Sequence, residues 1–492
     1  MAAGFVLGSP GLALAQSTPV APAPGATVEV VPLRVMRDKG LITDGEYQSA
    51  LKDMTESVGT KTAEDSTNFV IGKWSTTLYG FAEGDYIYDS TQSYPDLAGA
   101  GLVQRPGTYA GNNSRTQFSV RNSRVGLRFR APEYHEIRAS AVFETDFLVG
   151  EAPVGYTAGQ NPYQQSENNF FTNPVMRIRH FYLKVETPVV DVLVGQTWHL
   201  FGWQGSYQPN TVQYQGIPGE LYARTTQLRL SKTLKTKDLT FDVAIAAMRP
   251  PQRDSGVPEG EGGVHLAVNG WKGAQTMGAT GTTVSPLSFA ITGDVRHVSV
   301  PEFAAKPVNS NDKTAASVAF DAFVPVLPAH EGKLGNSLSI LGEAVTGYGI
   351  VDQFTGLSSG VGFPSLPPAA GSMAAQTFNP QIDPGIVTYD ATGTLRFIQW
   401  TTYRIGAQYY LPGIDGKMWL SANYSHMGSA NAKDYGAATS VLSSLDWFDL
   451  NVMGDLTPAV RLGLEYANYN TEYADGIHAI DHRVQGSAFF IF

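Results

Sequence analysis

The sequence predicts an all-β protein, a transmembrane antiparallel β-barrel of sixteen strands that follows a short α-helical segment. Three observations predict this fold. Apolar and polar side chains alternate from Trp74 to the end of the chain, which is the period of a strand. The connections between these strands alternate between long and short. The last strand ends on aromatic residues at Phe490 and Phe492, and such an edge avoids aggregation when it pairs with the first strand of a closed barrel.

The composition agrees with a barrel and excludes a membrane protein built from helices. The 492 residues contain no cysteine and 16% charged residues, and they carry a formal net charge of −10. No segment approaches the roughly 20 consecutive apolar residues that a spanning helix needs. A spanning barrel is apolar on one face only, so its mean hydropathy resembles that of a soluble protein. The absence of cysteine suits a bacterial protein that is exported to an oxidising compartment.

The residues before the barrel predict export and a helical segment. Residues 1–15 resemble a signal peptide that lacks its basic start and is therefore incomplete, and residues 16–29 form a linker rich in Pro and Ala. Residues 30–58 predict two short helices, of which the second begins at a capping box of Thr43 and Glu46. Helices this short need a partner. We expect them to self-associate or to pack on the periplasmic rim of the barrel, and a frayed arm is the alternative.

The barrel is expected to occupy residues 74–492. The expected strands are 74–90, 115–131, 136–149, 175–187, 189–198, 221–234, 237–249, 261–271, 285–300, 314–327, 335–349, 392–411, 416–427, 444–454, 458–473 and 479–492. Long connections at one end and tight turns at the other are typical of bacterial outer-membrane barrels. An even number of strands places both ends of the barrel domain on the tight-turn side. The segment 272–284 is longer than the turn expected there.

Basic residues occupy the polar side of the early strands. The cations expected to line the lumen are Arg121, Arg124, Arg128, Arg130, Arg138, Lys184 and Arg229. Arg121 joins them only if a β-bulge lies near residues 122–123, and parity leaves Arg177, Arg179 and Arg224 undecided. Arginines on neighbouring strands would form a track that concentrates anions. Glu144 and Asp146 are expected to face this track and to create a transverse field. The alternative is that these charges only solvate a general lumen.

One long connection, residues 199–220, is rich in Gly, Gln and aromatic residues. A connection of this length either folds inward as a constriction or lies on the surface. Trp203 and Tyr207 are the candidate constriction residues, whereas Trp198 is expected in the aromatic belt at the membrane interface.

Catalytic motifs give no support for an enzyme. The sequence contains no Gly-rich phosphate loop, nucleophile elbow or His-Glu-x-x-His motif, and it calls for no cofactor. His180 and His199 lack a metal-like spacing to a second ligand, so no metal site is expected. An acidic chain without a basic patch on a recognisable module also argues against nucleic-acid binding.

Short motifs in a fixed order resemble a known family. They are Leu41-Ile42-Thr43-Asp44-Gly45-Glu46-Tyr47, Ser123-Arg124-Val125-Gly126-Leu127-Arg128-Phe129, Arg179-His180-Phe181-Tyr182, Gly195-Gln196-Thr197-Trp198 and Leu462-Gly463-Leu464-Glu465-Tyr466. From about residue 30 to 492 the chain resembles Gram-negative outer-membrane porins of the DcaP-like group, which are related to phosphate-selective porins. The resemblance implies a homotrimer of sixteen-stranded barrels, a periplasmic helical segment and passage of small anions such as dicarboxylates. It also implies that Arg124 and Arg128 line the lumen.

The combined hypothesis is a passive channel for small anionic solutes in the bacterial outer membrane, with the helical N-terminus in the periplasm. Its expected partners are outer-membrane lipid, the anionic solutes, further copies of the chain and the barrel assembly machinery, for which Phe492 and Phe490 resemble the recognition signal. The alternatives are a phosphate or general-diffusion porin, or a plugged barrel that serves as a surface anchor or adhesin.

Overall fold

The computed structural model describes the chain mainly from residue 68 onward. The described residues are 38–39, 43, 47, 68–71, 74–98, 102–148, 171–213, 216–252, 255–278, 280–330, 332–354, 360–366, 368, 371, 373–374, 378, 381–383 and 385–492. The predicted signal peptide and linker, and most of the predicted helical segment, lie outside these residues and remain predictions. The chain divides into two compact units, Met1–Ser66 and Thr67–Phe492. The second unit carries everything described below.

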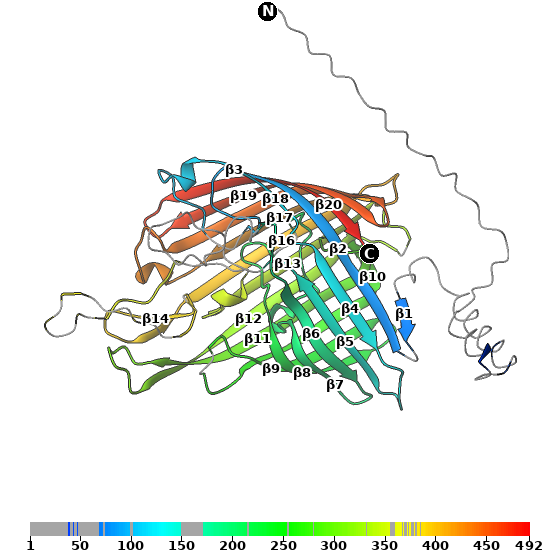
Figure 1. The fold of residues 1–492 in the computed structure, drawn as a ribbon, viewed down its shortest axis with the longest axis horizontal. Helices are drawn as coiled ribbons and strands as arrows, with labels where there is room; N and C mark the ends of the chain where they lie inside the picture. The colour runs from blue at the N-terminus through cyan, green and yellow to red at the C-terminus, as the bar shows by residue number, and fades with distance from the viewer. Residues whose placement is uncertain are drawn as a thin grey trace, which may run out of the picture. The chain divides into compact units, whose positions relative to one another are not determined.

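Sixteen antiparallel strands form a closed barrel (Figure 1). In chain order they are β2 (Trp74–Asp89), one strand in two parts, β3 (Arg115–Ser119) and β4 (Arg124–Arg130), β5 (Arg138–Asp146), β6 (Arg177–Glu186), β7 (Asp191–Trp198), β8 (Arg224–Lys235), β9 (Leu239–Met248), β10 (Glu259–Gln275), β11 (Thr283–Pro301), β12 (Ser310–Leu327), β13 (Ser337–Tyr348), β16 (Gln399–Tyr410), β17 (Met418–Gly428), β18 (Leu442–Thr457), β19 (Val460–Tyr473) and β20 (His478–Ile491). Each strand pairs with its neighbours in sequence, and the predicted fold class is confirmed.

Small elements accompany the barrel. A short strand, β1 (Asn68–Ile71), forms a hairpin with the start of β2, and a separate hairpin joins β14 (Val387–Tyr389) to β15 (Leu395–Phe397). Single turns of 3-10 helix lie at Ala110–Asn112, Phe201–Trp203, Val351–Gln353 and Ala432–Asp434. Among the described residues, no helix is long and apolar enough to cross a bilayer.

The last strand closes the barrel against the first. β20 pairs with β2 from Phe81 opposite Ile491 to Asp89 opposite Arg483. Two further backbone hydrogen bonds extend this seam, because the Gly80 N–H donates to the Phe492 carbonyl at 2.9 Å and the Phe492 N–H donates to the Gly80 carbonyl at 3.0 Å. Closure therefore leaves no edge strand in the barrel wall.

The expected strands occur in the expected order, and the differences concern their ends. The strand expected at 115–131 is interrupted between β3 and β4. The strand expected at 392–411 begins too early, because the hairpin of β14 and β15 precedes β16. At the unexpectedly long turn, β10 continues to Gln275 across a shift in its pairing with β11, which leaves only residues 276–282 as the connection.

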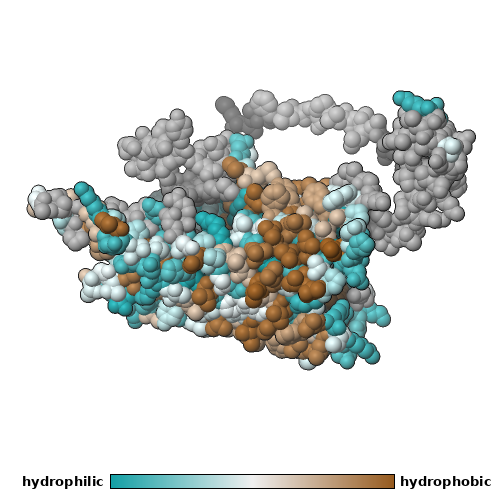
Figure 2. Space-filling view, turned by 90° about the horizontal axis from the view of Figure 1, so that it is seen from below, coloured by the Kyte–Doolittle hydropathy of each residue, from teal (hydrophilic) through white to brown (hydrophobic). Residues whose placement is uncertain are grey.

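The outer face of the barrel is apolar. Side chains that alternate along each strand with buried ones are exposed and hydrophobic, as shown on β20 by Phe490, which is 55% exposed, beside Phe489, which is 2% exposed. Figure 2 shows such side chains gathered in a broad patch over the barrel wall, with hydrophilic ones on either side of it. Soluble monomers rarely expose a broad apolar patch, because its contact with water is unfavourable. Contact with the hydrocarbon of a bilayer is favourable, as on the outer face of membrane-spanning barrels.

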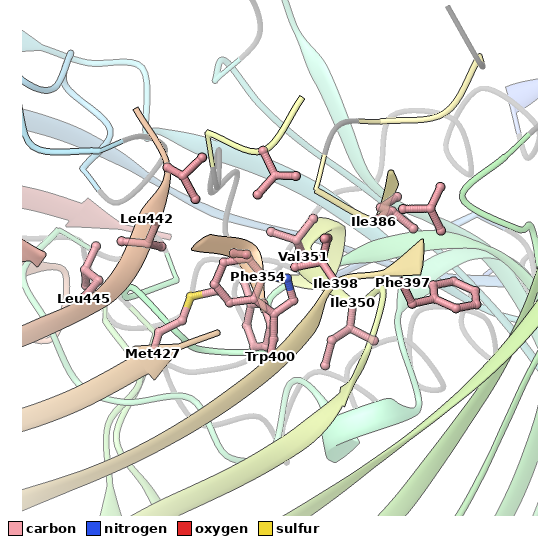
Figure 3. Close-up of a cluster of buried hydrophobic side chains, with 14 of the residues drawn as sticks. Ile350, Val351, Phe354, Ile386, Phe397, Ile398, Trp400, Met427, Leu442 and Leu445 are labelled. Atoms are coloured by element: carbon pink, nitrogen blue, oxygen red, sulfur yellow. The ribbon is translucent and has the colours of Figure 1, made fainter. Parts of the chain in front are cut away.

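The interior is not uniformly polar. A large apolar cluster lies where the long connections meet the inner wall, and it includes Ile350, Phe354, Ile386 and Trp400 (Figure 3). Trp447 belongs to the same cluster. Trp400 and Trp447 come from strands, whereas the other three come from the connection between β13 and β16. Long connections thus fold inward and build a core inside one end of the barrel.

Candidate functional site

Two β-bulges bring arginines onto the inner wall. The first lies between β3 and β4, which together use one residue more than the facing stretch of β2. This extra residue turns Arg121 inward, where it is 2% exposed and forms a 2.7 Å ion pair with Asp96 of the connection 90–114. The structure therefore places a bulge where the sequence requires one.

The second bulge resolves the position of two further arginines. The register of β6 against β5 shifts at Arg179, which has no residue opposite it. As a result Arg177, Arg179 and His180 all lie on the inner side, although strict alternation would divide them between the two faces. The sequence signal of this bulge is the run Arg-Ile-Arg-His at residues 177–180, in which polar side chains are adjacent instead of alternating with apolar ones.

Two carboxylates hold these arginines in place. Arg179 lies 2.7 Å from Glu144 and 3.0 Å from Asp146, Arg177 lies 2.7 Å from Asp146, and Arg124 lies 3.5 Å from Glu144. The prediction that Glu144 and Asp146 face the arginines across the pore is wrong. Neighbouring antiparallel strands present their paired residues on the same face, so these acids lie beside the arginines rather than opposite them.

Arg224 has a different environment, although it belongs to the same cluster. Its guanidinium lies 4.5 Å from the ring centre of Trp198 and 5.2 Å from that of Tyr222. Among the described residues it has no hydrogen-bond or ion-pair partner, and its Nη1 atom is inaccessible to solvent. The two rings stabilise the cation without neutralising it, so the positive charge of Arg224 is not compensated by a carboxylate of the described residues.

The remaining predicted cations continue along the same wall toward the tight-turn end. Arg128 lies 3.9 Å from the ring centre of Tyr79, and Arg229 donates to Gln227 and to the carbonyl of Trp198. Arg130 is exposed, and Arg138, with a side chain 65% exposed, lies 3.8 Å from Glu186. Lys184 lies 3.1 Å from the same carboxylate. The inner faces of β4–β8 therefore carry a ladder of basic side chains.

Acidic residues dominate the rest of the inner wall. The buried acids on β2, β10–β13 and β18–β20 are Glu83, Asp85, Asp89, Glu259, Glu261, Asp294, Asp321, Glu343, Asp449, Glu465 and Asp481. The buried arginines on β10–β20 are Arg296, Arg404, Arg461 and Arg483. Charge is therefore segregated around the described barrel, and the field across the lumen comes from these acids rather than from Glu144 and Asp146.

The connection 199–223 crosses the lumen between these walls. The Trp203 ring stacks on His265 at 5.4 Å, and the Tyr207 hydroxyl donates to Ser288 at 3.1 Å. Beyond them, Asn210 is fully buried and meets the far side of the barrel. Its side-chain oxygen accepts hydrogen bonds from Trp419 at 2.8 Å and Ser421 at 2.6 Å, and its carbonyl accepts them from Asn423 at 2.8 Å and Asn451 at 3.2 Å.

Buried charge also holds this connection. Glu220 accepts a hydrogen bond from the Ile217 N–H at 3.0 Å, and Glu343 accepts one from the Leu221 N–H at 3.1 Å. Arg404 forms an ion pair with Glu343 at 3.3 Å and donates to the Tyr207 carbonyl. Burial raises the pKa of Glu220 to about 8, and nearby Arg404 offsets this only in part.

Trp198 does not occupy the outer aromatic belt that the sequence suggested. Its ring centre lies 4.7 Å from that of Tyr222 and 5.4 Å from that of His180. A Cβ atom on Gly205 would come within 2.8 Å of the same indole, so the inward connection packs directly against it. Trp198 therefore supports the arginine cluster and the constriction together.

Comparison with solved structures gives the same fold. The outer-membrane channel DcaP of Acinetobacter baumannii matches with a TM-score of 0.59 and 18% sequence identity, over 87% of this chain and 100% of that chain. The anion-selective porin from Comamonas acidovorans matches with a TM-score of 0.48 and 12% identity, over 85% and 100% of the two chains. No protein-family profile and no curated protein matches the sequence. The resemblance to the DcaP-like group is confirmed at the level of the fold.

Proposed function

We propose that this chain is an outer-membrane channel through which small anionic solutes diffuse passively, guided by the basic wall of β4–β8. The observation that carries the proposal is the separation of charge inside the barrel, with an excess of basic residues on β4–β8 and an excess of buried acids on the rest of the described wall. An anion entering such a lumen is attracted to one wall and repelled by the other, which confines it to a track. The apolar exterior and the closed seam fit a barrel embedded in lipid.

The spacing of the cations favours organic acids with more than one carboxylate. Three cations offer successive sites to a solute. Arg224 lies at the long-connection end of the track, and Arg128 and Arg229 lie nearer the tight-turn end. A guanidinium binds a carboxylate through two parallel hydrogen bonds. Each site offers a single guanidinium, so no single site binds so tightly that transport stops. Phosphate is also an anion that guanidinium groups bind in this way, and it is the alternative solute.

Planar-bilayer recording tests this proposal. In a tenfold gradient of KCl, the reversal potential of an anion-selective channel takes the sign set by chloride, and we expect that sign for this protein. Addition of a small dicarboxylate to one side should then reduce the chloride current by competition, more than an equal concentration of a neutral sugar does. A reversal potential of the cation sign would refute the anion track while leaving the barrel unaffected.

A specific observation favours one other function, that of a plugged barrel that anchors surface loops. The connections at the long-loop end pack into the large apolar cluster around Trp400 and Trp447 inside the wall. A core in this position can block the lumen as well as narrow it. The same recording distinguishes the two functions, since a plugged barrel would insert into the bilayer without step conductance.

We further propose that the protein assembles as a homotrimer and that barrel assembly machinery recognises its last strand. The aromatic residues Phe490 and Phe492 at the end of β20 have the alternation that such a signal requires, with Phe490 exposed on the outer face. Light scattering of the detergent complex, corrected for bound detergent, measures the number of chains directly.

A further inference from the structure

A cluster of one histidine and several acids lies where the inward connection leaves the barrel wall. His199 is the first residue after β7, and Glu259 and Glu261 lie on β10. One ligand atom from each of the three lies within 4.8 Å of the others, and all three residues are buried. The sequence analysis found no partner for His199, because these carboxylates follow it by about sixty residues and only the barrel brings them together.

The cluster contains more negative charge than the protein neutralises. Asp294 on β11 lies opposite Glu261 in the strand register and is fully buried, and Asp352 contacts the same arginine as Asp294. Arg296 is the shared cation, with contacts of 2.6 Å to Glu259, 3.2 Å to Asp294 and 2.6 Å to Asp352. Four carboxylates thus share one arginine and one histidine. Burying a carboxylate without compensation is costly, so this balance favours an additional positive charge.

Unsatisfied acceptor atoms give a second and independent indication. Both carboxylate oxygens of Asp294 are inaccessible to solvent and accept no hydrogen bond within the described part of the chain, since the contact with Arg296 is an ion pair without hydrogen-bond geometry. The Oε1 atom of Gln353 is in the same state, while its amide nitrogen donates to Glu259 at 3.0 Å. These three atoms are acceptors, whereas the cluster contains one donor without a hydrogen bond among the described residues, Nε of Arg296, which lies 3.2 Å from Asp294. Acceptors are therefore in excess, and a cation is a ligand that satisfies acceptors.

The donor atoms indicate which cation fits. An imidazole nitrogen with carboxylate oxygens is a donor set of Zn²⁺, Mn²⁺ and Fe²⁺, whereas Ca²⁺ and Mg²⁺ prefer oxygen ligands alone. The ligands are also oriented by outer hydrogen bonds, as metal ligands usually are. Glu261 accepts the N–H groups of Leu200 at 2.7 Å and Phe201 at 2.9 Å, and its other oxygen lies 2.7 Å from Nδ1 of His199. An ion shared by His199 and Glu261 would therefore take the place of the proton between Nδ1 of His199 and this oxygen of Glu261.

We propose that His199, Glu259 and Glu261, with Asp294 beside them, bind a divalent transition-metal cation such as Zn²⁺. The bound cation would join the start of the connection 199–223 to β10 and so fix the constriction at its root. Asp352, whose side chain is 22% exposed, offers the side from which the ion enters. The site is independent of the solute that crosses the barrel, so it stands or falls separately from the proposed function.

Calorimetric titration of the untagged, detergent-folded protein with ZnCl₂ after treatment with a chelator tests the site. We expect one Zn²⁺ per chain, and binding at least about tenfold weaker in both His199→Ala and Glu259→Gln. His265→Ala is the matched control, because His265 also pairs with a carboxylate, Asp242 at 2.8 Å, and touches the same connection through Trp203, but it lies outside the cluster. This control should bind Zn²⁺ like the wild type.

A second measurement needs no variant and therefore does not depend on whether the variants fold. Co²⁺ added to the wild-type protein should give a visible absorption spectrum that differs from that of aqueous Co²⁺ and disappears when an equivalent of Zn²⁺ is added. An unchanged Co²⁺ spectrum, or Zn²⁺ binding that is equal in the wild type and in folded His199→Ala, would overturn the proposal.

Discussion

At the scale of single residues, the arginines of the basic wall differ in how much of their charge is available. Arg177 and Arg179 are each bound to carboxylates at 3.0 Å or less, so their charge is largely compensated. Arg224 lies over two aromatic rings and has no carboxylate partner among the described residues. Arg224, which parity alone could not place, therefore carries a charge that no carboxylate of the described residues compensates, as does the exposed Arg128 over Tyr79.

We therefore expect Arg224→Gln to reduce anion selectivity more than the loss of a paired arginine does. Removing one charge beside a water-filled path changes the energy of an ion by about 0.5–1 kcal/mol, which corresponds to a fall in the chloride-to-potassium permeability ratio of about two- to fivefold. The measurement is the reversal potential in a KCl gradient. Arg105→Gln is the control, since Arg105 pairs with Asp475 in the exposed connections. Equal ratios for the wild type and Arg224→Gln would show that this guanidinium lies off the path.

At the scale of elements, the connection 199–223 depends on a few polar contacts across the lumen. Asn210 accepts four hydrogen bonds from two neighbouring strands, three from β17 and one from β18. Apolar packing contributes as well, because Ile217 and Leu221 belong to the large inner cluster. The span is therefore held at its far end as well as along its length.

Replacing Asn210 with alanine should loosen this constriction without unfolding the barrel. The substitution removes the side-chain bonds to Trp419, Ser421 and Met453 and leaves the indole N–H of Trp419 buried without a partner, at a cost of about 1–3 kcal/mol to the docked connection. We expect larger fluctuations of the open-channel current and faster proteolysis within 199–223. Asn470→Ala, which removes an asparagine bonded to His478 on the outer side, should behave as the wild type. Current noise that is identical in both variants would argue against this anchor.

The constriction should also depend on pH through Glu220. Its pKa is raised by burial from 4.5 to about 8, so the docked state holds a proton that the undocked state releases. The stabilisation is fully present below about pH 4.5 and is lost as pH rises through 8. We expect current fluctuations to increase between pH 6 and 9 in the wild type and to stay constant in Glu220→Gln. The same increase in both proteins would assign the pH dependence to another group.

The sequence predicts the elements well and the site only in part, for a physical reason. Alternation along a strand is local, so it reveals all sixteen strands and the outer face that ends at Phe490. A β-bulge is a mismatch between two strands, and the sequence predicts one only where parity already fails, as at Arg121 and Arg179. The destination of the connection 199–223 depends on Asn210 and its distant partners, and nothing in its own residues specifies them. The His199 cluster is inaccessible to sequence reasoning for the same reason.

At the scale of the whole molecule, the barrel combines an apolar exterior with an interior divided by charge. The basic wall is made from strands in the first half of the barrel and the acidic wall mainly from the second half and β2. Closure places Asp89 of β2 beside Asp481 of β20, with Arg483 of β20 2.7 Å from Asp89. The seam between the first and last strands therefore completes the acidic wall as well as the hydrogen-bonded cylinder.

Removing Phe492 separates the role of this residue in the seam from its role as an assembly signal. Its two backbone bonds to Gly80 contribute about 1–3 kcal/mol in total, a small part of the hydrogen bonding that closes sixteen strands. We therefore expect the shortened protein to refold into detergent with nearly the wild-type yield, measured by its migration in unheated gels. In cells, the amount in the outer membrane should fall severalfold, because the aromatic end that the assembly machinery would recognise is lost. Phe492→Tyr keeps the ring and should preserve both. An equal loss in refolding and in cells would assign Phe492 to the stability of the seam alone, since a recognition signal has no role when the chain folds without the machinery.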